Sequence, residues 1–66
     1  MHYNTANKHL KNCTVVLQLL GEIEHSAVMS MDLKLLSKIR QAQDMIRDAK
    51  DALMEHKYAH EHGRKK

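Results

Sequence analysis

The sequence contains no proline, tryptophan or phenylalanine, and only two glycines are spread over its 66 residues. Proline and glycine are the strongest breakers of regular structure, so little in this chain stops a helix once it has begun. The aromatic residues are two tyrosines, and β-branched residues form a run only at Thr14, Val15 and Val16. These absences argue against a β-sheet and favour an all-α fold.

Cysteine is also scarce, because Cys13 is the single one in the chain. No intrachain disulfide can form, and an unpaired thiol is typical of a reducing compartment. The longest apolar stretch, TVVLQLL, is much shorter than the roughly 20 residues that a membrane span needs. The N-terminus lacks the basic-then-apolar order of a signal peptide. We therefore expect a cytoplasmic protein that does not enter a membrane.

The formal net charge of +3 is concentrated at one end of the chain. Positive and negative residues cancel within residues 1–31 and again within residues 32–55. The excess lies in residues 56–66, where Lys57, Arg64, Lys65 and Lys66 outnumber Glu61. This distribution argues against a broad nucleic-acid-binding surface but permits a short basic tail. We expect residues 1–66 to form a single helical-hairpin domain, with residues 62–66 as a flexible basic tail.

Two segments have the apolar spacing of amphipathic helices. The first is expected to be capped by Asn4 or Thr5 and to end near His25, with an apolar residue every three or four positions. Residues 25–32 are expected to form the turn. Ser30 is the expected cap of the second helix, with Asp32 in its first turn, where a negative charge suits the helix dipole.

The second helix is predicted to be longer than the first, at roughly 30 residues against roughly 20, or about 45 Å against 30 Å. A turn near residue 28 would place Ala6 beside Lys50 and leave residues beyond about 52 unpaired. Because Leu53 continues the apolar pattern there, we expect a homodimer that forms a four-helix bundle, or a higher oligomer. The alternative is that this overhang frays. The predicted oligomer seam comprises Leu10, Cys13, Leu17, Leu20, Leu35, Ile39, Ala42, Ile46, Ala49 and Leu53.

Charged residues occupy the opposite side of the second helix. Arg40 and Asp44, like Arg47 and Asp51, are four residues apart, and Asp44 and Arg47 are three apart, so each pair can interact along the helix. Such a surface is either merely solvated or a docking surface for a partner.

The C-terminal segment MEHKYAHEHGRKK permits two kinds of ligand. His56 and His60 share one helix face, which suits zinc, although two ligands do not complete a site and no cofactor is required. Phosphates could contact the basic residues while bases stack on a tyrosine. The candidate ligand-binding residues are Tyr3, Lys57, Tyr58, Arg64, Lys65 and Lys66. Alternatively, these cations only complement the dipole at the end of a helix.

The sequence contains no convincing set of candidate catalytic residues. Cys13 lies in the predicted apolar seam, where a small buried side chain is the simpler interpretation, and no nucleophile–base pair or phosphate loop is visible. We predict a small non-enzymatic, oligomeric interaction or regulatory protein that binds a partner protein. The alternatives are a nucleotide or nucleic-acid binder acting at an oligomer interface, and a metal-dependent helical assembly.

Overall fold

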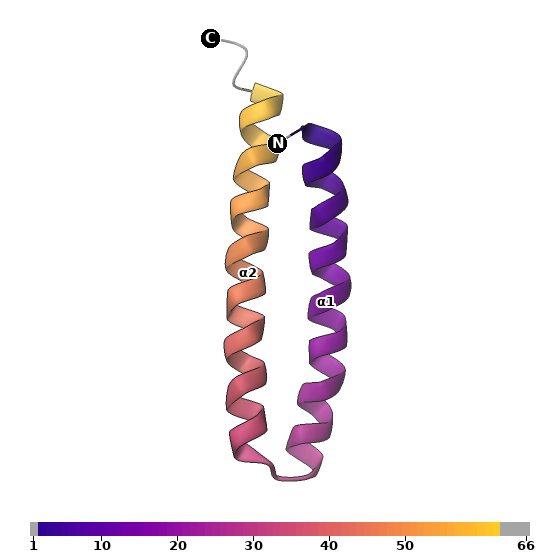
Figure 1. Cartoon of the computed structure of the whole chain (residues 1–66), viewed down its shortest axis with the longest axis vertical. Coiled ribbons are helices and arrows are strands. Elements are labelled where there is room, and N and C mark those ends of the chain that lie inside the picture. Colours follow the sequence, from indigo (N-terminus) through magenta and orange to yellow (C-terminus); the bar gives the residue numbers. More distant parts are fainter. Residues whose placement is uncertain (1, 63–66) are drawn as a thin grey trace.

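The chain is an antiparallel helical hairpin, as the sequence predicts (Figure 1). The computed structural model describes residues 2–62, and it describes side chains for residues 2–57. Helix α1 spans Tyr3–Met29 and helix α2 spans Leu33–His62. Within residues 2–62 there is no β-strand, so the all-α prediction is confirmed for this range.

Helix α1 is longer at both ends than its sequence indicates. His2, rather than Asn4 or Thr5, caps it: the His2 Nδ1 atom accepts a hydrogen bond of 3.1 Å from the backbone N–H of Asn4. The helix then continues through Gly21 and past His25 to reach 27 residues. It continues because no residue after Gly21 breaks it and because Ala27, only 1% exposed, packs between the helices.

The turn is shorter than predicted and takes three residues, 30–32. The backbone N–H of Asp32 donates to Ala27 O at 2.9 Å and that of Met31 donates to Val28 O at 3.0 Å, which is the Schellman arrangement at a helix end. Met31 takes the left-handed conformation this motif requires, with φ of 55°. Ser30 ends α1, and Asp32 caps α2 instead, its Oδ1 accepting from the N–H of Leu35 at 3.1 Å.

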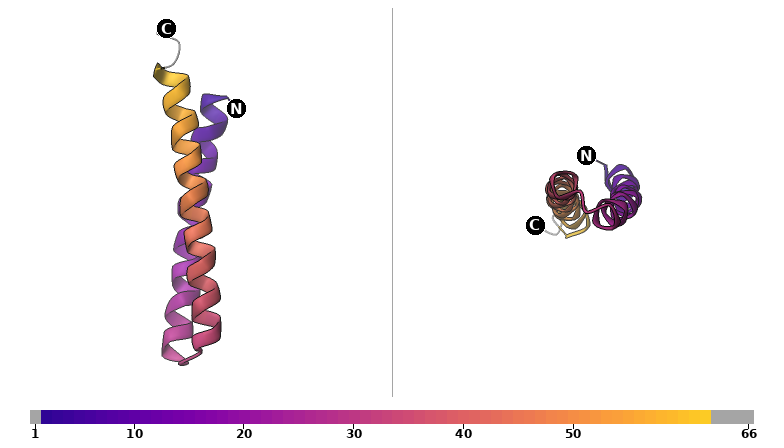
Figure 2. Two further views of the ribbon diagram at one scale, coloured as in Figure 1. Left: turned by 90° about the vertical axis from the view of Figure 1, so that its left-hand side faces the viewer. Right: turned by 90° about the horizontal axis from the view of Figure 1, so that it is seen from below.

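The two helices lie side by side along almost their whole length (Figure 1), and the view along the hairpin shows them as two neighbouring rods (Figure 2). The molecule measures 53 × 15 × 12 Å, so it is only one helix thick. The predicted start of the overhang at about residue 52 is wrong: Lys57 Nζ lies 3.5 Å from Asn7 Oδ1 and 5.7 Å from the centre of the Tyr3 ring, and only the last turns of α2 extend past α1 (Figure 1). Helix α1 begins earlier and the turn lies later than the sequence predicts, so residues of α1 lie beside α2 as far as Lys57.

The core between the helices is thin. Its buried apolar residues are Ala6, Leu10, Ala27 and Ile39, and Gln43 is buried with them. Many larger apolar side chains in the described part of the chain remain exposed. A hairpin alone therefore leaves much apolar surface in contact with water.

Candidate functional site

Residues at the contact between α1 and α2, called the seam below, repeat with a heptad pattern. They are the buried and half-buried residues whose spacing alternates between three and four positions. The α1 members are Tyr3, Ala6, Leu10, Cys13, Leu17, Leu20, Glu24 and Ala27, and the α2 members are Leu36, Ile39, Gln43, Ile46, Lys50, Leu53 and Lys57. This repeat is typical of coiled-coil packing.

Seven of the ten predicted oligomer-seam residues lie in this intrachain seam: Leu10, Cys13, Leu17, Leu20, Ile39, Ile46 and Leu53. The other three, Leu35, Ala42 and Ala49, each lie one residue before a seam position. One residue turns the helix by about 100°. The predicted seam of the second helix thus combines two adjacent stripes. One contacts α1, and the other lies at the edge of that contact, with Ala42 half-buried and the other two residues exposed.

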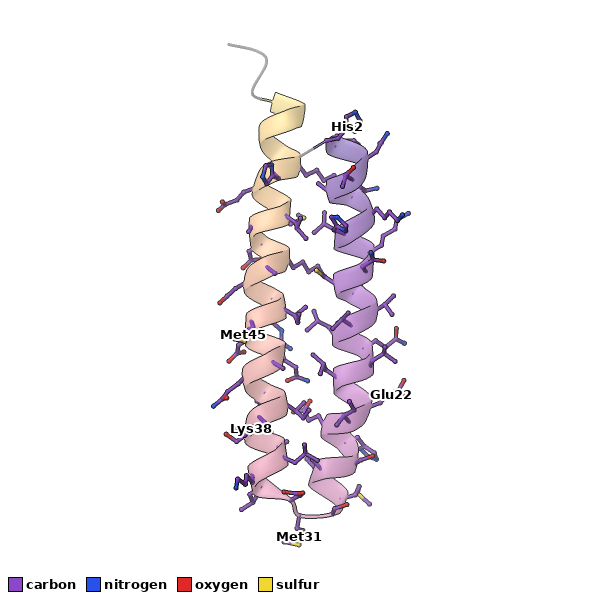
Figure 3. All side chains as sticks on the ribbon, in the orientation of Figure 1. His2, Glu22, Met31, Lys38 and Met45 are labelled. Carbon is purple, nitrogen blue, oxygen red and sulfur yellow. The ribbon has the colours of Figure 1, made fainter. Side chains whose placement is uncertain are left out.

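The positions one residue before the seam form an apolar face on the hairpin. One residue before the seam, α1 carries Val16, Leu19 and Ile23, and α2 carries Ala42, Met45 and Ala49. Because the helices are antiparallel and face each other, the same rotation from the seam brings both stripes to the same side of the hairpin. Leu19 is 52% exposed and Met45 is 72% exposed. Figure 3 shows the side chain of Met45 outside the strip between the helices.

The opposite side, called the polar face below, consists of residues one position after the seam together with the seam's own polar members. Arg47 and Asp44 form an exposed ion pair here at 3.6 Å, one of the three predicted pairs along α2. An open hollow of about 390 Å³ lies on this side. It is lined by Leu17, Arg47, Lys50, Asp51 and Met54.

Glu24 joins the two helices at the edge of the polar face. Its Oε1 accepts a hydrogen bond of 3.0 Å from Gln43 Nε2, and its Oε2 accepts one of 3.2 Å from Arg40 Nε. The hydrogen bond from Gln43, followed by that from Arg40, holds the pKa of the Glu24 carboxyl below its ordinary value. Arg40 therefore pairs across the hairpin with Glu24 and not with Asp44, the partner its spacing indicates. Polar groups buried in a heptad seam fix its register.

The open end of the hairpin brings together two candidate ligand-binding residues that are far apart in the sequence. Lys57 lies over the ring of Tyr3 at a distance suited to a cation–π interaction. It also contacts Asn7. The side chain of Tyr58 lies outside the described side chains. Arg64, Lys65 and Lys66 lie outside the described residues, as does most of the predicted tail at 62–66.

His56, the first of the two candidate metal ligands, is exposed and lies one position before the seam residue Lys57. His60 belongs to α2, but its side chain lies outside the described ones. Among the residues that the structure describes, no group of three or more His, Cys, Asp or Glu is placed to hold a metal ion. In the same part of the chain, neither helix has an apolar window long enough to cross a membrane.

The division into two faces is the feature that sequence reasoning missed. The sequence contains one sign of the apolar face, because Val16, Leu19 and Ile23 are apolar and lie beside the seam residues of α1. Recognising the α2 half of that face requires the correct seam register in α2. Neither a protein-family model, nor a curated protein, nor a solved structure matches the chain.

Proposed function

We propose that this chain is a small non-enzymatic interaction protein that assembles as a four-helix bundle and binds a partner protein through its polar face. The observation that carries the proposal is the division of the hairpin into two chemically different sides. An exposed apolar side is characteristic of an assembly surface. The polar side then remains available to a different partner, whose activity the chain regulates by occupying it.

The hollow on the polar face indicates the chemistry of that partner. The two cations of the hollow, Arg47 and Lys50, outnumber the single carboxylate of Asp51, and the other lining residues supply apolar surface beside them. Arginine and methionine are both enriched at protein interfaces, and a guanidinium holds a carboxylate through two parallel hydrogen bonds. The Arg47–Asp44 pair is exposed, so exchanging Asp44 for a partner's carboxylate costs little. The expected partner presents an acidic side chain next to an apolar one.

Site-specific photo-cross-linking in cells tests this proposal. A photoreactive residue replaces Met54 in the hollow, and a matched variant carries it at Glu22, which points away from α2 (Figure 3). We expect a discrete cross-linked species from position 54 that is absent from position 22. Adding Arg47→Glu, at an exposed side chain of the same hollow, should abolish that species by reversing the charge beside the probe. Identical products from both positions, or a product that is unchanged by Arg47→Glu, would contradict the proposal.

Anion binding at the open end is a second candidate function, favoured by the approach of Lys57 to Tyr3. An aromatic ring beside a cation is a suitable surface for a base and its phosphate. Fluorescence anisotropy with a labelled single-stranded oligonucleotide, and competition by ATP, provide the assay. Lys57→Met and removal of residues 63–66 should each weaken binding if this candidate is correct. Unchanged affinity in both variants would exclude it.

The chemistry of Cys13 favours a cytoplasmic location for the protein. This thiol is unpaired and half-buried in the seam. Free thiols are typical of reducing compartments, and we place the protein in the cytoplasm on that ground.

A further inference from the structure

We infer that the apolar face is covered by a second copy of this chain, related by a two-fold axis. Val16, Leu19 and Ile23 of α1 and Ala42, Met45 and Ala49 of α2 form its centre. The inference rests on the assembly part of the proposed function and deepens it by naming the surface and its occupant.

The chain exposes more surface than a compact monomer of its mass, and the excess is close to the area that one partner buries in a stable dimer. The chain exposes 5186 Å², whereas compact monomers of 7.7 kDa expose about 4300 Å² by the scaling of surface with mass. The excess of roughly 900 Å² is close to the 800 Å² or so that each partner buries in a standard interface. An interface of standard size would therefore bring the exposed surface of the chain to the value of a compact protein.

The two stripes of the apolar face lie at the same height along the hairpin. The contact between Glu24 and Gln43 and that between Asn7 and Lys57 set the antiparallel register, so residues 16–23 lie beside residues 42–49. A copy turned by 180° consequently sets apolar surface on apolar surface. This self-complementarity is what a two-fold interface requires.

Side-chain size also favours a helical neighbour. The α1 stripe is made of bulky residues. In the α2 stripe, Ala42 and Ala49 have small side chains on both sides of Met45. Facing large and small residues let helices interdigitate at the close distances seen in bundles.

Charge points to a second copy over an unrelated protein. The six residues at the centre carry no charge, and the charged or polar residues Lys38 and His56 lie at the two ends of the α2 stripe. An interface between different proteins is usually selected by complementary charges near its rim, whereas a two-fold interface with an uncharged centre needs only its own copy.

Sedimentation equilibrium over a range of protein concentrations tests the inference, using two matched substitutions on α2. Met45→Glu puts a charge at the centre of the apolar face, and because Met45 is 72% exposed in the single hairpin, the substitution removes little contact within one chain. Met54→Glu makes the same chemical change on the polar face, at a side chain only 39% exposed. Circular dichroism reports the helix content of each variant at the same concentrations.

We expect the wild type and Met54→Glu to sediment with the mass of two chains. Met45→Glu should weaken dimerisation by roughly a hundredfold or more, since an unpaired charge would be buried in the interface. Loss of helix in Met45→Glu only at low concentration has the same meaning, because it shows that folding depends on the pair. A monomeric wild type, a trimer or larger species, or a Met45→Glu variant that dimerises like the wild type would overturn the inference. Cross-linking from position 54 in the Met45→Glu background separates this outcome from failure of partner binding.

Discussion

Replacing Gly21 with alanine should stabilise the protein, although glycine is often kept where a larger residue would clash. Gly21 lies in the middle of α1, and a Cβ atom built there meets nothing within 4 Å. Its position, one residue after a seam residue, places it on the polar side and away from the apolar face. Glycine inside a helix costs about 0.8–1 kcal/mol relative to alanine, because it loses more backbone entropy on folding. With no packing penalty to subtract, Gly21→Ala should raise the free energy of unfolding by roughly 0.5–1 kcal/mol.

Thermal unfolding followed by circular dichroism at fixed protein concentration measures this gain. For a chain of this size, 1 kcal/mol shifts Tm by about 4–8 °C, so the expected rise is roughly 2–8 °C. Gly21→Val is the matched control, because valine fills the same space but has a lower helix propensity than alanine. Its stability should fall between those of glycine and alanine. An unchanged or lowered Tm in Gly21→Ala, or a larger gain in Gly21→Val, would refute an open, continuous helix at this position.

Three further predictions concern the turn and the Glu24 interaction, and thermal unfolding tests each of them. Met31→Gly should raise stability by about 0.5–1 kcal/mol, because Met31 adopts a φ of 55° and its side chain is 83% exposed; destabilisation would contradict this turn. Asp32→Ala should cost about 1 kcal/mol by removing the cap of α2, whereas Ser30→Ala should cost much less. Glu24 has a lowered pKa in the folded chain, so its stabilising contribution is present above its unfolded pKa and is lost as the pH falls toward the folded value. Wild-type Tm should therefore fall more steeply than that of Glu24→Gln below about pH 4.5, and parallel profiles would contradict the interaction.

The fold class and the length of α2 were predictable because they depend on local rules. The absence of proline and the regular apolar spacing after Leu35 indicate a long helix, and α2 indeed has 30 residues. The ends of α1 were less predictable. Glycine at position 21 and the polar residues after it suggest an early end, but burial of Ala27 against α2 is a tertiary effect that no local pattern contains.

The register of the seam was the harder part of the candidate site. Apolar periodicity selects Ala42 and Ala49, yet the structure puts their neighbours Gln43 and Lys50 in the seam. A buried glutamine is acceptable there only because Glu24 on the other helix accepts its hydrogen bond, and a half-buried lysine keeps its stem in the seam while its charge reaches water. These compensations come from the partner helix, so the sequence of α2 alone does not show them. The proposal of a homodimer therefore rests on the apolar face and not on the overhang of α2, which the structure shortens.

The most direct test of that face uses the wild-type chain and the rate at which peroxide oxidises each methionine, since oxidation follows solvent exposure. In the single hairpin Met45 and Met29 are almost equally exposed, at 72% and 71%. Met29, the last residue of α1, lies outside the apolar face and serves as the internal control. If a second copy covers the apolar face, Met45 should oxidise several-fold more slowly than Met29, and dilution should reduce the difference. Equal rates for the two methionines at every concentration would contradict the account.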